Sequence, residues 1–340
     1  MTAMEPVRRG RTLAVATTPD RVRRLRTAVD AAAGGRTLLL CTELSEPTPA
    51  AAAATAQLAT LAAFTFAYAT GKPVSTVLPV PDVTRDPGEA RDRAAQLEWL
   101  TGYRESAARG PIGQADRWLS QLSLAPRFDA AEAAFLDRMT KAWAFATAYG
   151  GDPAEVAKVL SADRYLAWPA STSAHPRLIR ESRAEGAAYG LLSPGVLCRP
   201  VADRPDSRRV GELVNPVVLR LRPGIRADEL ARLCGRLNPA RTPGRLALLT
   251  PPAPAKRLGR YLTATAGHRP AWVLGCGSGR RAAPRLHRME SVLRAHGAQL
   301  GGVWLAGRGR WLEQVVRLAT VLASRPTVPI LDHTMTGAAG

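Results

Sequence analysis

Residues Asn215–Leu249 read NPVVLRLRPGIRADELARLCGRLNPARTPGRLALL, an alternation of apolar and helical segments. Two apolar runs, Val217–Leu221 and Arg245–Thr250, flank a segment of helical period, Arg226–Leu237. Continuous apolar runs of this length are typical of strands that are covered on both faces, as in a parallel sheet. Pro223-Gly224 marks a turn before the helix. The segment therefore predicts a strand, a helix and a second, parallel strand.

The same alternation continues outward through the rest of the chain. Further apolar runs are Arg36–Cys41, Pro73–Val80, Gly195–Cys198, Ala271–Cys276 and Gly302–Ala306. Further segments of helical period are Asp20–Ala33, Pro49–Ala69, Ala130–Tyr149 and Arg310–Ala323. About seven strands that alternate with helices predict either a doubly wound sheet or a (β/α)8 barrel, and the pattern alone does not separate the two.

The chain of 340 residues is long enough for one large barrel or two ordinary domains. Residues 85–164 contain no strand candidate, and they indicate a helical insertion, at about 88–165, between the second and third strands. We find no internal repeat and no low-complexity linker. One domain over residues 1–340 is therefore expected.

The net charge of +19 comes mostly from arginines that are spread from Arg8 to Arg325. A basic protein attracts nucleic acids and anionic metabolites alike. However, the chain has no dense Lys/Arg block and no RNA- or DNA-binding motif, so we expect no specific nucleic-acid partner.

The sequence also predicts a cytoplasmic protein with no membrane partner. No run reaches the ~18 apolar residues of a membrane helix, and Leu13–Thr17 is too short for a signal peptide. The four cysteines, Cys41, Cys198, Cys234 and Cys276, are far apart and form no CxxC pair. This spacing is typical of free thiols in a reducing compartment.

Asn215–Leu249 resembles the class II 3-deoxy-heptulosonate-7-phosphate (DAHP) synthases in the order and spacing of its motifs. Asn-Pro opens a strand, a glycine-proline turn leads into a helix, and Leu-Asn-Pro precedes Pro-Gly-Arg-Leu and the next strand. Weaker similarity covers Arg21–Leu40, Ala69–Pro73, Ala148–Ala154, Thr172–His175 and Gly301–Val303. The resemblance implies a (β/α)8 barrel with its active site at the carboxyl ends of the strands.

The resemblance also implies a chemistry. DAHP synthases condense phosphoenolpyruvate with erythrose 4-phosphate at the start of the shikimate pathway. They need manganese or cobalt, held by Cys, His, Glu and Asp, and cations that bind two phosphate-bearing substrates. They tend to form oligomers and to associate with other enzymes of aromatic biosynthesis, so a homo-oligomer or a partner enzyme is expected.

Most of the implied site residues are replaced in this sequence. Ser45 stands for the metal-binding cysteine, Arg280 for the histidine and Ala306 for the seventh strand's glutamate. Only Arg220, in the place of an active-site lysine, keeps a cation. Other departures are Pro79, Asp86-Pro87-Gly88, Cys198–Ala202, Pro251 and, in place of a histidine, Trp304. The eighth strand's motif is absent, which indicates a barrel shortened at that strand. We therefore expect no metal cofactor and predict no catalytic residue.

A basic mouth of the barrel would remain. Arg220, Arg280 and Arg281 are expected at strand ends, with Arg199 nearby, and all four are candidates for binding an anionic small molecule. The alternative is that they pair with acids or face water. Cys276, in the glycine-rich turn Gly275–Gly279, is a further candidate beside backbone N–H groups that could approach a phosphate, although a structural thiol is the favoured interpretation.

Three functions remain open, and whether the protein is an enzyme is open with them. The preferred hypothesis is a divergent homologue that has lost the parent condensation and has a non-catalytic or binding role in aromatic or specialised metabolism. The second is a repurposed, metal-independent enzyme that acts on an anionic metabolite. The third is a working DAHP synthase whose strand ends are misaligned.

Overall fold

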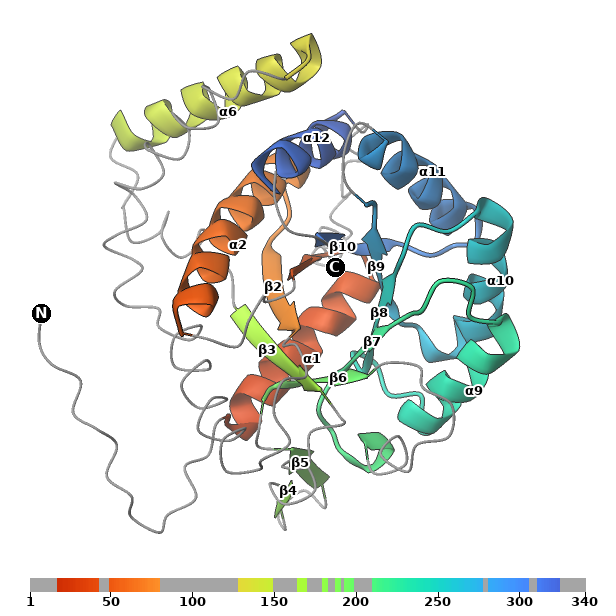
Figure 1. The fold of residues 1–340 in the computed structure, drawn as a ribbon. Coiled ribbons are helices and arrows are strands. Elements are labelled where there is room, and N and C mark those ends of the chain that lie inside the picture. Colours follow the sequence, from red (N-terminus) through yellow and green to blue (C-terminus); the bar gives the residue numbers. More distant parts are fainter. Residues whose placement is uncertain are drawn as a thin grey trace, which may run out of the picture.

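A computed structural model describes residues 17–42, 49–79, 128–148, 164–169, 179–182, 187–190, 193–198, 210–277, 281–305 and 311–324. Eight parallel strands form a closed barrel, which Figure 1 views along its axis. In barrel order they are β1 (Leu38–Thr42), β2 (Val74–Pro79), β3 (Arg164–Pro169), β6 (Gly195–Cys198), β7 (Val217–Arg220), β8 (Leu246–Thr250), β9 (Ala271–Gly275) and β10 (Leu300–Leu305). The predicted (β/α)8 barrel is confirmed.

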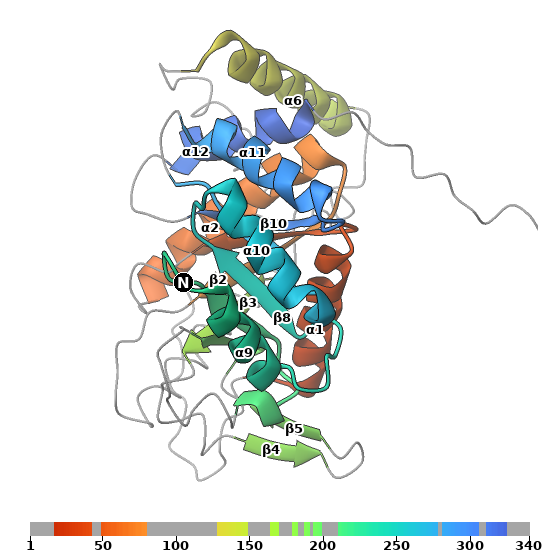
Figure 2. The same ribbon diagram turned by 90° about the vertical axis from the view of Figure 1, so that its right-hand side faces the viewer.

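Helices cover the outside of the barrel. They are α2 (Pro49–Thr70), α9 (Ala227–Leu237), α10 (Ala255–Thr265), α11 (Ala282–Ala295) and α12 (Trp311–Ala323). A small antiparallel sheet of β4 (Ile179–Ser182) and β5 (Ala187–Gly190) lies apart from the barrel (Figure 2). None of the described helices is both long enough and apolar enough to cross a membrane.

The expected shortening at the eighth strand is wrong. β10 pairs with β1 through Leu39–Gly302 to Thr42–Leu305, so the barrel closes with a full set of eight strands. The strand that the sequence analysis missed is the third, β3, which lies at the end of the region assigned to the helical insertion. As a result, Arg220 ends the fifth strand of the barrel, whereas the resemblance places it on the fourth.

The first helix, α1 (Pro19–Ala33), closes the amino end of the barrel. Thr18 caps it by accepting the Arg21 N–H. Its buried stripe of Val22, Leu25, Val29 and Ala32 has helical period, and the last three belong to the same apolar cluster as the barrel lumen. The Arg26 side chain donates to the Pro243 carbonyl, just before β8, at 3.1 Å. In Figures 1 and 2 this helix lies across one end of the barrel, so the carboxyl end is the one that remains for a ligand.

Alternation along the strands divides the core into a lumen and an outer layer. Leu39 and Cys41 of β1 point into the lumen, whereas Leu38 and Leu40 point toward the helices. Gly302 is required where β10 meets β1, because a Cβ there would collide with the Leu39 carbonyl. The strands can approach closely at this point only without a side chain.

The helix α6 (Ala130–Ala148) lies between β2 and β3 in the chain and outside α2 and α12 in space (Figures 1 and 2). Asp129 and Glu132 form a reciprocal cap at its start, with bonds of 3.1 and 2.9 Å. Glu132 also makes a largely buried ion pair of 3.2 Å with Arg317 of α12, and Arg317 lies 3.5 Å from Glu313. The described part of the predicted helical insertion is thus anchored by charge as well as by apolar contacts.

Candidate anion site at the mouth of the barrel

Two side chains meet across the carboxyl end of the lumen. Arg220 is the last residue of β7, two positions after the lumen residue Val218, and Trp304 lies near the end of β10. The central carbon of the Arg220 guanidinium lies 5.0 Å from the centroid of the Trp304 ring. This is a cation–π distance. Because β8 and β9 separate the two strands in the barrel order, the contact spans part of the mouth.

Gly275 makes room for the indole ring. A Cβ at this position of β9 would lie 2.8 Å from a carbon of the Trp304 ring, which is closer than real side chains approach. Register supports the same placement, since Trp304 pairs with Gly275 on one side and with Cys41 on the other. The missing side chain of one strand therefore fixes the position of the aromatic ring of the next.

Trp304 carries a buried donor without an acceptor. Only 5% of the residue is exposed, and its indole N–H has no hydrogen-bond partner in the described structure. Such a group costs about 1–3 kcal/mol relative to a satisfied one. Buried unpaired donors in native proteins commonly mark the place of a water, an ion or a ligand. Beside a guanidinium, the matching ligand group is an anionic oxygen.

Of the other arginines named from the sequence, the structure describes Arg281, which does not join this pair. Arg281 is exposed and precedes α11, where its backbone carbonyl accepts the Arg285 N–H. Arg199 and Arg280 lie outside the described residues. Of the two candidates that the structure describes, Arg220 is the one at the lumen.

Cys276 lies in the layer between barrel and helices and not in the lumen. It packs in the outer apolar cluster with Leu274, Ala282 and Leu286, and its thiol faces the Leu274 carbonyl at 3.8 Å. Burial raises the pKa of the Cys276 thiol to about 12. A protonated, enclosed thiol is a poor nucleophile, so this environment favours the structural interpretation of the residue.

The residues at the family's metal positions do not fit a metal. Ser45, Arg280 and Ala306 offer a hydroxyl, a cation and a methyl group where the resemblance implies Cys, His and Glu, and all three lie outside the described residues. Within the part of the chain that the structure describes, no three His, Cys, Asp or Glu side chains gather as a metal site would require.

The eight barrel strands hold no Asp, Glu, His or Lys. Their charged residues are Arg164, at the start of β3, and Arg220. General acid–base catalysis needs a side chain that exchanges a proton near neutral pH. An arginine stays protonated there. Arg220 can therefore bind and orient an anion but does not exchange a proton, and the other ionisable side chains in the described lumen are the Cys41 thiol and the Tyr165 phenol.

Trp304 is the residue that sequence reasoning missed as a site candidate, since it entered only as the replacement of a histidine. Its N–H became significant only when the structure showed it to be buried and unpaired. Fold and site together define a (β/α)8 barrel with a cation and an indole at its mouth.

Comparisons with known proteins do not assign a family. No family model matches the chain, and no curated protein matches it. A tryptophan synthase from M. tuberculosis, in its aminoacrylate- and BRD0059-bound form, is 14% identical over 88% of this chain and 96% of that chain, with a TM-score of 0.29. The open form with BRD0059 bound is also 14% identical, over 89% and 97%, with a TM-score of 0.25. Likeness at this level carries no argument about function.

Proposed function

We propose that this protein is a divergent relative of the class II DAHP synthases that has lost the parent condensation and binds an anionic metabolite at the mouth of its barrel, without a metal. The observation that carries the binding role is the Arg220–Trp304 pair, with its buried indole N–H that lacks an acceptor. The relationship to DAHP synthases rests on the resemblance of Asn215–Leu249 and on the barrel fold.

The surroundings of the pair strengthen its attraction for an anion. The lumen below it is lined by apolar residues, among them Cys41, Val77 and Leu249. Electrostatic interactions and hydrogen bonds are stronger in such a region of low dielectric constant than in water. A carboxylate or phosphate oxygen between the guanidinium and the indole N–H would accept from both, which also satisfies the orphaned donor.

A binding role is proposed because Arg220 and the Trp304 N–H offer a cation and a hydrogen-bond donor to an anion, and an arginine does not exchange protons near neutral pH. On the resemblance, we assign the protein to aromatic or specialised metabolism in the cytoplasm. There it would act as a homo-oligomer or beside a partner enzyme. An anionic carboxylic or phosphorylated metabolite of such a pathway is the expected ligand.

The test is calorimetric titration with phosphoenolpyruvate as a probe anion, in the presence of EDTA. We expect saturable binding that weakens about tenfold or more in Arg220→Gln, because a charge-assisted hydrogen bond is lost. Arg281→Gln is the matched control, since it removes the same charge from an exposed position at the same end of the barrel. Equal binding by wild type and Arg220→Gln would contradict the assigned site.

A second measurement tests the loss of the parent reaction. Folded protein is assayed with phosphoenolpyruvate, erythrose 4-phosphate and added manganese or cobalt, and phosphate release is followed. We expect no release above a no-protein control. Metal-dependent turnover would contradict the proposal and identify a working DAHP synthase. Metal-independent consumption of a bound anion would instead support a repurposed enzyme.

A further inference from the structure

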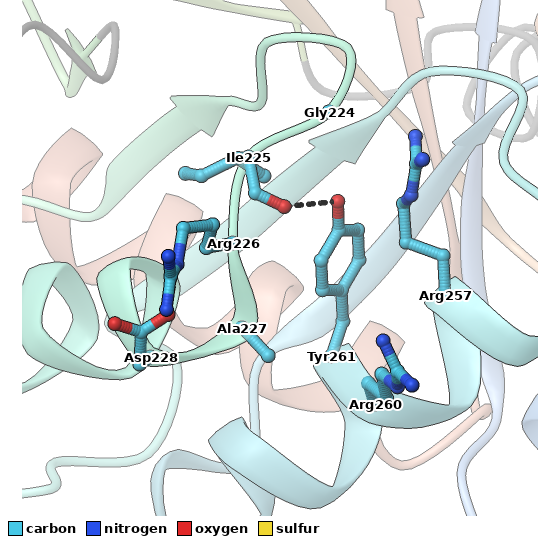
Figure 3. Close-up of a pocket in the computed structure, with 8 residues that line it drawn as sticks. All are labelled: Gly224, Ile225, Arg226, Ala227, Asp228, Arg257, Arg260 and Tyr261. Atoms are coloured by element: carbon cyan, nitrogen blue, oxygen red, sulfur yellow. Dashed lines mark hydrogen bonds and ion pairs between the residues drawn. The ribbon is translucent and has the colours of Figure 1, made fainter.

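A second cationic pocket lies in the helix layer, outside the lumen. It occupies about 390 Å³ between the start of α9 and the first half of α10, and Figure 3 shows the residues that line it. The Tyr261 hydroxyl donates to the Ile225 carbonyl at 2.7 Å and so ties α10 to the β7–α9 connection. In Figure 3 this bond lies between Arg226 on one side and Arg257 and Arg260 on the other.

The positive charge of this pocket exceeds its negative charge. Three arginines, Arg226, Arg257 and Arg260, line it with a single carboxylate, Asp228. That carboxylate is already bonded to Arg226 at 3.0 Å and to Arg232 at 3.3 Å. Among the described residues, neither Arg257 nor Arg260 lies within ion-pair distance of an acid.

The neighbouring sequence supplies no further acids. Between Glu229 and Glu290 the chain contains no Asp or Glu, while α10 alone carries Lys256, Arg257 and Arg260 near its amino end. Glu229, at the edge of the region, is bonded to Arg222 at 2.8 Å. Cations in the first turns of a helix oppose its dipole and repel one another. A bound anion would remove both penalties.

We propose that the pocket between α9 and α10 binds a phosphate group, either as inorganic phosphate or as the phosphate of a small metabolite. Two arginines of α10 and one of the β7–α9 connection line it, and the planar fork of arginine matches the oxygens of a phosphate. The site is separate from the Arg220–Trp304 pair, since it is built by α10 and the β7–α9 connection and not by lumen residues.

The experiment measures thermal stability and calorimetric binding with inorganic phosphate and with glycerol 3-phosphate. Sodium chloride replaces each probe at constant ionic strength, which removes general screening from the comparison. We expect saturable stabilisation of the wild type by a phosphate probe. The affinity should fall about a hundredfold in Arg257→Gln/Arg260→Gln, about tenfold for each lost contact. Tighter binding of the ester would assign the pocket to a phosphorylated metabolite, and tighter binding of the free ion to phosphate itself.

The matched control is Arg138→Gln/Arg288→Gln, which removes two exposed charges from α6 and α11. It should bind phosphate like the wild type. No saturable effect beyond chloride, or an equal loss in the control, would overturn the proposal. Binding that disappears in Arg220→Gln but persists in Arg257→Gln/Arg260→Gln would also overturn it, and would place the phosphate at the barrel mouth. Binding that persists in Arg220→Gln but is lost in Arg257→Gln/Arg260→Gln supports this pocket. The site at the barrel mouth is then tested separately, by the titration with phosphoenolpyruvate.

Discussion

Replacing Trp304 with phenylalanine tests the unpaired indole N–H directly. Phe keeps an aromatic ring near the Arg220 guanidinium but removes the donor and part of the ring. Loss of buried contacts and the small cavity should cost about 1.5–3 kcal/mol. Removal of a buried, unsatisfied donor should stabilise the folded state by about 1–3 kcal/mol, because its desolvation cost disappears. We therefore expect the free energy of unfolding of Trp304→Phe to lie within about 1 kcal/mol of the wild-type value, even though Trp304 is buried, with 5% of its surface exposed.

The control is Trp272→Phe, at a tryptophan of β9 that is 3% exposed and whose N–H is not among the buried unpaired groups. This variant should be destabilised by the full cost of the lost contacts and the cavity, about 1.5–3 kcal/mol. Urea unfolding at constant m-value measures both differences. Binding of phosphoenolpyruvate should weaken about tenfold in Trp304→Phe and stay unchanged in Trp272→Phe. An equal loss of stability in the two variants would show that the Trp304 N–H has a partner and is not an open donor for a ligand.

Three further predictions concern the helices and strands around the barrel. Glu132→Gln should lower the free energy of unfolding by about 2 kcal/mol in urea, because it breaks the buried ion pair with Arg317. Glu132→Ala should cost about 1 kcal/mol more, since glutamine keeps the helix cap and alanine does not, and equal losses would exclude a contribution from the cap. Burial raises the pKa of the Cys234 and Cys276 thiols from about 9 to about 12. As the pH rises, the unfolded chain therefore loses these two protons before the folded chain does. The free energy of unfolding should then fall above about pH 9, by about 1.4 kcal/mol per pH unit for each thiol. Cys234→Ala/Cys276→Ala should flatten this dependence of stability on pH. An unchanged dependence would show that the two thiols do not cause it. Gly275→Ala should displace the Trp304 ring and destabilise the protein by about 1–3 kcal/mol. The near-ultraviolet circular dichroism spectrum should change as the ring moves. An unaltered spectrum would mean that the ring does not lie against β9.

Much of the barrel could be predicted from the sequence because its strands are continuous apolar runs. The expected runs at Gly195–Cys198 and Val217–Leu221 agree with β6 and β7 to within a residue. β3 was missed because RYLAWP has a short apolar centre between an arginine and a proline, a pattern that weakly predicts a strand. Its place is decided by pairing with β2 and β6, which is a non-local interaction that local periodicity does not contain.

The candidate site was predictable only in part, for the same reason. Arg220 could be placed at a strand end from the apolar run before it. Its partner Trp304 lies on a different strand, and the contact depends on the register that joins β9, β10 and β1. The pocket of Arg257 and Arg260 is formed by α10, which was not among the predicted helices, and becomes visible only when α10 packs beside α9.

Both proposed sites depend on one connection of the chain. Arg220 ends β7, and Arg226 begins the approach to α9 six residues later. The Leu221 N–H, bonded to the Leu249 carbonyl at 2.9 Å, and the Tyr261–Ile225 bond hold this connection at both ends. A substitution within it can therefore disturb either site through the backbone. The decisive variants are those on other elements, Trp304→Phe on β10 for the barrel mouth and Arg257→Gln/Arg260→Gln on α10 for the phosphate pocket, because each removes ligand contacts without altering the shared connection.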